Sequence, residues 1–162
     1  MARCEEVSGA VLGVVFEELR TQSVVLEALI LKPNMVLPGL ACAEQDGVEA
    51  VAVATVRCLR RNVPAAVAGV AFLSGGQSSE LASARLNAMN SGVASGGGSP
   101  WPLVFSFARA IQQPALGIWR GEAANVAAAQ HALLHRARCN HAALCGAYDA
   151  AMEHEPALRL AS

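Results

Sequence analysis

Lysine is almost absent from this chain: among its 162 residues and its 12 Lys and Arg side chains, Lys32 is the single lysine. Charge is also scarce, and the 13 acidic side chains leave a net charge of -1. A chain so close to neutral has no field that attracts nucleic acid. Long apolar runs are missing too, since no charge-free run consists of the about 18 apolar residues that span a bilayer. We therefore expect no nucleic-acid partner and no membrane.

We also expect neither a secretory leader nor a disulfide framework. Residues 1–20 carry Glu5, Glu6, Glu17 and Glu18, which argues against a signal peptide. The five cysteines have neither the paired spacing of a zinc site nor the density of a disulfide-stapled domain; they are Cys4, Cys42, Cys58, Cys139 and Cys145. We expect them to be reduced, mostly buried thiols of a cytoplasmic protein.

Hydrophobic residues, by contrast, are abundant and make up 54% of the chain, which suits one domain with one core. Their spacing has a helical period in some segments and forms nearly continuous runs in others. Helices are predicted over 4–20, from Asp46 onward, and over 78–90 and 121–145. Strands are predicted over 24–36, 66–73 and 102–107, the first of them covered on both sides. A strand followed by a helix, three times, predicts a parallel α/β sheet.

Two of the predicted helices carry recognisable start signals. Asp46 is placed to cap one helix, and Glu49 three positions later completes a capping box. Ser78 or Ser79 is placed to cap the helix over 78–90. These residues would satisfy the first backbone N–H groups of each helix, which have no partner within the helix itself.

Lys32 lies within the apolar run Ala28–Val36. An ammonium surrounded by aliphatic side chains loses hydration, which favours the neutral amine. A neutral amine is a nucleophile towards carbonyl groups. The alternative is an edge-strand lysine whose stem packs on apolar surface while its head reaches water. Taken alone, the run favours this alternative, because charged side chains are seldom fully buried.

A Ser-Gly-Gly turn, Ser74-Gly75-Gly76, connects the second predicted strand to a helix. Backbone N–H groups of such a turn can converge with a helix N-terminus on an anion, and glycine places no side chain in the way. An ordinary strand-to-helix turn is the alternative. Arg109 occupies the same place after the next strand, and its guanidinium suits bidentate contact with phosphate. The two loops together predict an anion site.

The remaining candidates carry weaker signals. The glycine-rich stretch 91–99 indicates a flexible connection, because no strand leads into it and no lysine follows, as a phosphate loop requires. His131 and His135 lack the glutamate of a zinc-protease helix, so a solvated outer face is expected for them. Packing is the expected role of three aromatic side chains, Trp101, Trp119 and Tyr148.

Three segments, in order along the chain, resemble class I fructose-bisphosphate aldolases. Leu31–Val36, which reads Leu-Lys-Pro-Asn-Met-Val, is similar to the family's segment with the Schiff-base lysine. Val63–Ser78 resembles its Ser-Gly-Gly strand and loop, and Pro100–Ala110 resembles its last strand. With the neighbouring helices the resemblance covers about residues 3–149. A partial-barrel domain over 1–149 and a short C-terminal tail over 150–162 are therefore expected.

The resemblance implies a fold class, a reaction and a site. The fold would be the C-terminal part of a (β/α)8 TIM barrel, with three parallel strands that correspond to its sixth, seventh and eighth. Lys32 would form an imine with fructose 1,6-bisphosphate, which the family cleaves in glycolysis to dihydroxyacetone phosphate and glyceraldehyde 3-phosphate without a metal or other cofactor. The implied partners are a phosphorylated sugar and further copies of the chain, since the family forms tetramers. The implied phosphate-binding residues are Ser74, Gly75, Gly76, Ser106 and Arg109.

The chain also departs from the pattern of the family. The acid/base glutamate, the catalytic aspartate and the second lysine that the family carries on its first five strands have no counterpart here. Ala28-Leu29 stands where the family usually has Gly-Thr, and Ala108 replaces a glycine near the phosphate. The alternative function is therefore a catalytically inactive, truncated aldolase that retains phosphate-sugar binding or only self-associates.

Overall fold

The structure of the chain is a computed structural model that describes residues 1–92 and 98–154. Three strands form one parallel sheet in the order β1-β2-β3, with β1 at Ile30–Leu31, β2 at Gly69–Phe72 and β3 at Leu103–Phe105. Each strand pairs with the next one in the sequence. The parallel α/β prediction is confirmed, and β2 is the central strand.

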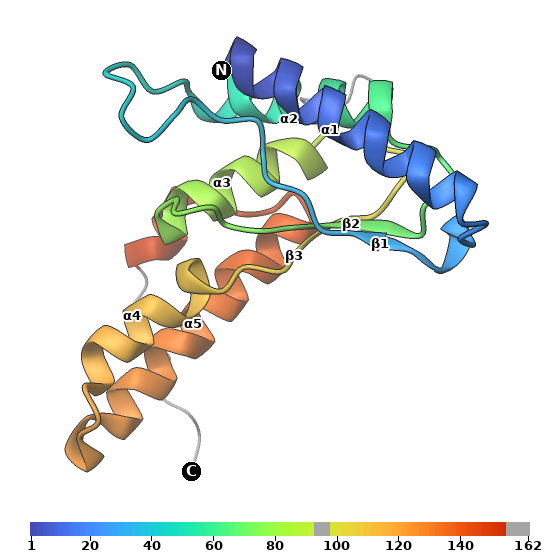
Figure 1. Cartoon of the computed structure of the whole chain (residues 1–162). Helices are drawn as coiled ribbons and strands as arrows, with labels where there is room; N and C mark the ends of the chain where they lie inside the picture. The colour runs from blue at the N-terminus through green and yellow to red at the C-terminus, as the bar shows by residue number, and fades with distance from the viewer. Residues whose placement is uncertain (93–97, 155–162) are drawn as a thin grey trace.

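In the described part of the chain, five α-helices and three short 3-10 helices accompany the sheet (Figure 1). Helices α1 and α2 pack against each other, and α2, α3 and α5 form a continuous series of neighbours. Helices α4 and α5 pair closely and extend away from the sheet. Within the described residues, no helix is long and apolar enough to cross a membrane. The bounds are α1 Ala2–Thr21, η1 Leu26–Ala28, α2 Val48–Asn62, α3 Ser79–Asn90, α4 Arg109–Trp119, η2 Ala123–Asn125, α5 Val126–Leu144 and η3 Ala150–His154.

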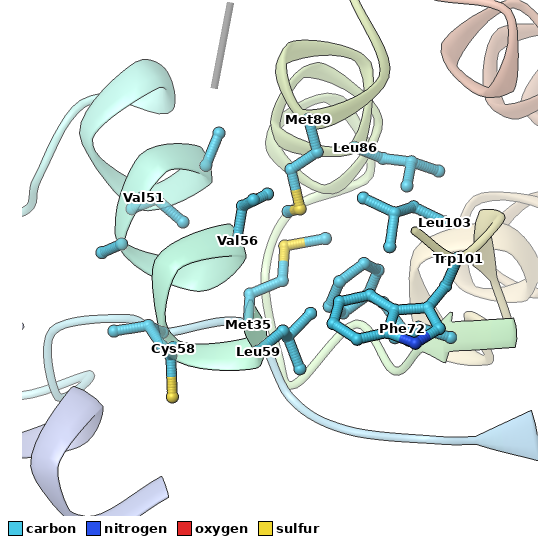
Figure 2. Packing of buried hydrophobic residues seen from close by; sticks show 14 of the residues in the cluster. Met35, Val51, Val56, Cys58, Leu59, Phe72, Leu86, Met89, Trp101 and Leu103 are labelled. Atoms are coloured by element: carbon cyan, nitrogen blue, oxygen red, sulfur yellow. The ribbon is translucent and has the colours of Figure 1, made fainter. Parts of the chain in front are cut away.

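The hydrophobic core lies between β2 and the helices α2 and α3. Val70 and Phe72 of β2 are fully buried, and successive side chains of a strand point to opposite faces, so one face of the central strand is covered. Met35 and Met89 point toward one another in the middle of this core (Figure 2). Burial of a side chain such as Phe72 stabilises the fold by about 1.5 to 3 kcal/mol.

The opposite face of the sheet is open at β1. Ile30 is 65% exposed, and Lys32, two residues later and therefore on the same face, is exposed as well. The prediction of a strand over 24–36 covered on both sides is wrong in length and in burial. The regular strand is short because β1 is the edge of the described sheet and pairs only with β2.

The start signals of the helices were only partly predicted. Ser78 caps α3 as expected, since its Oγ accepts a hydrogen bond from the N–H of Leu81 at 3.2 Å. Helix α2, however, begins at Val48 after Gly47, without a side-chain cap. The predicted capping box is wrong: the Asp46 carboxylate lies 3.9 Å from the amino group of Met1.

Helix α4 was not predicted from the sequence. Pro114 lies inside it, and proline normally argues against a helix interior because it lacks the N–H donor. The predicted helix over 121–145 corresponds to η2 and α5. Between α4 and α5 the chain turns at Arg120 and Gly121, with φ angles of 53° and 80°. This left-handed pair lets α4 and α5 pack side by side.

Buried and exposed side chains also differ from some expectations. Trp101 is buried, and its indole N–H donates to the carbonyl of Pro64 at 3.0 Å, which confirms its packing role. Trp119 is 42% exposed, so the same prediction is wrong for that residue. The cysteines form no disulfide within the described residues, but only two of them are buried, Cys58 and Cys139, whereas Cys42 and Cys145 are exposed.

Two predictions concern segments that extend beyond the described residues. Of the glycine-rich stretch 91–99, residues 93–97 lie outside the described residues. Of the predicted tail 150–162, the part up to residue 154 is described, and it forms η3 against α3. The domain boundary at 149 stays a prediction.

Candidate functional site

The segments singled out in the sequence meet at the carboxyl edge of the sheet. The parallel ladder continues beyond the regular strands: the N–H of Leu73 donates to the carbonyl of Pro33 at 3.1 Å. In the same way the N–H of Ser106 donates to the carbonyl of Phe72 at 2.8 Å. Lys32, Ser74 and Ser106 therefore follow three adjacent strand ends. This edge is where parallel α/β folds place their ligands.

Lys32 follows β1 directly on the open face of the sheet. Its side chain is exposed, and the residue lies at the rim of an apolar hollow of about 360 Å³ between α1 and the end of β1. Leu12 and Leu59 are among the residues that line this hollow. The apolar enclosure expected for a neutral amine is absent from the described part of the chain. The structure shows the alternative arrangement, a lysine whose head reaches water.

The Ser-Gly-Gly turn has a backbone that favours glycine. The φ angles of Gly75 and Gly76 are 59° and 84°, a left-handed conformation that side-chain-bearing residues rarely adopt. A β-carbon on Gly75 would lie 3.3 Å from Cδ1 of Leu73. The turn therefore exposes its backbone, as an anion-binding loop requires.

The structure brings Arg109 to this turn. Nη2 of its guanidinium lies 3.8 Å from the position that a β-carbon on Gly76 would occupy. Arg109 and Gly76 together line a hollow of about 520 Å³, along with Gln77 and Ser78 at the start of α3. Arg109 is also the first residue of α4. An anion in this hollow would face a guanidinium and the positive ends of two helices.

Ser106 and Ser74 contribute to the edge in different ways. The N–H of Ser106 is already bonded to Phe72, so only its half-buried side chain is free to meet a ligand. Ser74 is only 4% exposed, and its carbonyl accepts hydrogen bonds from the backbone N–H and from the side-chain amide of Gln77, at 3.1 and 2.8 Å. Ser74 therefore anchors the turn through its carbonyl group.

Arg85 supports this anchor and was missed in the sequence. Its Nη1 donates to Oε1 of Gln77 at 2.8 Å, and its Nη2 donates to the carbonyl of Asp46 at 3.3 Å. Arg85 is 4% exposed, and this burial lowers the pKa of its guanidinium. Its helical spacing to Ala82 and Met89, which are both buried, was the signal: an arginine on the apolar face of a helix needs a buried partner.

A second, polar hollow of about 600 Å³ lies between α1 and α2, away from the carboxyl edge. Glu5 and Arg57 cross it with an ion pair of 2.6 Å. The hydrogen bond from Arg57 holds the pKa of the Glu5 carboxyl below its usual value. We assign this groove to the packing of two helices.

Comparisons with a family model and with known proteins agree on one family. The family model for "Fructose-bisphosphate aldolase class-I" matches residues 1–159. Fructose-bisphosphate aldolase 2 of Caenorhabditis elegans is 49% identical over 148 residues, which are 91% of this chain and 40% of that protein. The cytoplasmic isozyme 2 of Pisum sativum is 48% identical over 149 residues, 92% of this chain and 40% of that protein.

A solved structure agrees with these relatives. It is the fructose-bisphosphate aldolase of Plasmodium falciparum, in complex with TRAP and a small-molecule inhibitor. Its TM-score is 0.85 at 45% identity, over 91% of this chain and 42% of that one. The chain thus spans about 40% of the length of its relatives, and its three strands are part of a TIM barrel. It belongs to the class I fructose-bisphosphate aldolase family.

Proposed function

We propose that this chain carries the imine-forming lysine and one phosphate-binding loop pair of a class I aldolase acting on fructose 1,6-bisphosphate in the cytoplasm. The observation that supports this most is the position of Arg109, with Nη2 3.8 Å from the β-carbon position of Gly76. The two loops come from different strands. Their approach forms a concave site on the sheet edge that also bears Lys32, and the guanidinium of Arg109 lines this site, as does Glu80.

The anion site would hold a phosphate of the ketose. Arg109 would make charged hydrogen bonds, each worth about 1.5 to 3 kcal/mol. The bare backbone at Gly75 and Gly76 would allow the phosphate oxygens to approach closely. The side chain of Ser106 would supply a further donor. A phosphate fixed in this way would bring the carbonyl of the sugar to Lys32 and raise its effective concentration there.

Lys32 would react in its neutral form. Its nitrogen attacks the carbonyl carbon, and the carbonyl oxygen leaves as water after it takes one proton from the amine and one from solvent, which yields a protonated imine. When the bond between C3 and C4 breaks, this imine takes up the electron pair, while the proton of the C4 hydroxyl passes to a base. No carboxylate lines the described hollow beside Lys32. We therefore expect imine formation but slow or absent cleavage by the chain alone.

Borohydride trapping tests this proposal. Incubation with dihydroxyacetone phosphate and borohydride should reduce the imine to a stable secondary amine, and peptide mass mapping should find it on Lys32. Because the chain has one lysine, Lys32→Met should lose the internal label and leave any label at the amino terminus unchanged. Saturating substrate without an adduct on Lys32 rules out the catalytic assignment. Rapid cleavage of fructose 1,6-bisphosphate would reveal a base that we have not identified.

The second candidate function, an inactive protein that self-associates, is favoured by the open face of β1. Ile30 is 65% exposed on this face beside Lys32. An apolar sheet face and an unpaired strand edge both promote association. This candidate requires no imine, so the trapping experiment distinguishes it from the first.

A further inference from the structure

Three residues with metal-binding side chains meet between α5 and η3. Nε2 of His135 lies 3.4 Å from Oε2 of Glu153 and 3.7 Å from Sγ of Cys139. All three donor atoms lie within 4.8 Å of one another. None of these residues lines the hollow of Arg109, so the cluster is distinct from the proposed phosphate site.

Local structure explains why the three side chains converge. His135 and Cys139 are four residues apart on α5, and this spacing places them on one helix face. The chain leaves α5 through Gly146, whose φ is 67°. A β-carbon on Gly146 would lie 3.0 Å from Cα of Ser91. Glycine at this turn therefore lets the chain pass close to α3 and return, so that Glu153 of η3 faces α5.

We propose that His135, Cys139 and Glu153 bind one zinc-like divalent cation, with water as the fourth ligand. Zinc prefers four ligands in a tetrahedron, with bonds of about 2.0 to 2.1 Å to nitrogen and oxygen and about 2.3 Å to sulfur. Such bonds hold nitrogen and oxygen about 3.3 Å apart, and nitrogen and sulfur about 3.6 Å apart. Two of the three separations, 3.4 Å between nitrogen and oxygen and 3.7 Å between nitrogen and sulfur, match these values.

Glu153 is oriented by hydrogen bonds from two further residues. The hydroxyl of Tyr148 donates to its Oε1 at 2.7 Å, and Arg136 donates from Nη1 to its Oε2. Arg136 itself donates from Nη2 to the carbonyl of Ser79 and to the hydroxyl of Ser83. Carboxylates that ligate metals are commonly oriented by such outer partners. Oε2 retains a second lone-pair direction for the cation.

The ionisation of the cluster suits a cation. Burial raises the pKa of the Glu153 carboxyl, but the hydrogen bonds from Tyr148 and Arg136 outweigh burial and hold it below its usual value. The carboxylate is therefore charged at neutral pH. Cys139 would bind as a thiolate, so metal–sulfur bond formation releases the thiol proton to solvent. The charges of Glu153 and the thiolate offset the nearby guanidinium of Arg136.

No pattern in the sequence indicates this cluster. His135 was expected on a solvated outer face, but its side chain is only 27% exposed and contacts Glu153, so that prediction is wrong. Cysteine spacing was also uninformative, because the cluster uses one cysteine. The side chain of Glu153 is 12% exposed and Cys139 is buried, so a cation would enter past the imidazole.

Cobalt titration of the full chain, with a reductant that does not bind metals, tests the proposal. One equivalent of Co²⁺ should produce the near-ultraviolet band of a cobalt–thiolate bond, and Zn²⁺ should remove it. Cys139→Ala should abolish the band, and His135→Gln should weaken Co²⁺ binding by tenfold or more. Cys145→Ser and His131→Gln are matched controls near the two ends of α5, and both should titrate like the wild type.

Two further measurements test the proposal even if Cys139→Ala or His135→Gln folds poorly. Glu153→Gln preserves shape and should weaken Co²⁺ binding about tenfold, while the wild-type band should fade as pH falls because protons compete for the ligands. Zinc at a hundred times its Kd should raise the wild-type Tm by about 5 °C or more. A band that survives Cys139→Ala but disappears in Cys145→Ser would overturn the proposal. So would a wild type with no cobalt band and no shift in Tm.

Discussion

Arg85 of α3 donates a hydrogen bond from Nη1 at 2.8 Å to Oε1 of Gln77, which precedes this helix. Gln77 passes this restraint on, because its own amide donates to the carbonyl of Ser74. A buried guanidinium thereby fixes the loop that precedes Gly75 and Gly76. Nε of Arg85 has no hydrogen-bond partner within the described residues. The geometry of the proposed phosphate site thus depends on a side chain that does not line it.

Loss of this restraint should weaken phosphate binding without removing a phosphate ligand. Arg85→Gln should raise the Kd for dihydroxyacetone phosphate about three- to tenfold, because the loop loses one or two hydrogen bonds of about 1 kcal/mol each. Calorimetry measures the change. Arg20→Gln, on exposed α1, removes the same charge and should leave the Kd unchanged. A positioning role also predicts non-additive effects with Gln77→Ala; an unaltered Kd in a folded Arg85→Gln variant contradicts it.

Direct removal of the cationic ligand should have a larger effect. Arg109→Ala should weaken phosphate-sugar binding tenfold or more, since a charged hydrogen bond contributes about 1.5 to 3 kcal/mol. Gly75→Val should weaken it as well, through backbone strain at a φ of 59° and contact with Leu73. Arg120→Ala, at the other end of α4, is the charge-matched control. Unchanged binding in both Arg109→Ala and Gly75→Val means that the phosphate site is misassigned.

The open sheet face should make the isolated chain bind hydrophobic dyes or self-associate. The wild type should bind the dye ANS or sediment as an oligomer, because exposed Ile30 leaves apolar surface beside an edge of β1 that pairs with no other described strand. Ile30→Glu should reduce both signals. Val14→Glu is a suitable control, since Val14 of α1 is also 65% exposed but lies on a helix. A compact monomer that unfolds sharply and binds no ANS would refute the open-face interpretation.

The ion pair between Arg136 and Glu153 should make stability depend on pH. The folded-state pKa of Glu153 is lower than its usual value, so the pair contributes stability above the unfolded pKa of about 4.3 and loses it as pH falls through the folded value. Glu153→Gln should lower the free energy of unfolding by about 1 to 3 kcal/mol at pH 7, because Arg136 is 3% exposed.

Urea unfolding at several pH values, without added metal, measures this contribution. The difference between the wild type and Glu153→Gln should shrink below about pH 4. Glu17→Gln is the control, because its ion pair with Arg20 is exposed and such pairs contribute little. An equal difference at pH 3 and pH 7 would show that the carboxylate charge is not what stabilises this corner of the fold.

Local patterns in the sequence predicted the parts of the fold that depend on neighbouring residues. The helix over 4–20 and the cap at Ser78 are confirmed in α1 and α3, because helical period and capping act within one or two turns. The alternation of strands and helices predicted the parallel sheet, because a helix between two strands lets them run in the same direction. Helix α4 is not predicted by local patterns, because Pro114 lies inside it and proline disfavours a helix interior. Packing against α5 outweighs this local preference.

The sequence by itself determined which chemistry is available: one lysine, a Ser-Gly-Gly turn and an arginine after the next strand, in an order that resembles one family. Only the tertiary structure decided where these groups lie. It brought Arg109 to Gly76, left Lys32 exposed, buried Arg85 against Gln77 and turned Glu153 back onto His135 and Cys139. The reason is physical: contacts between residues far apart in the chain depend on how helices and strands pack, and no local period encodes that packing.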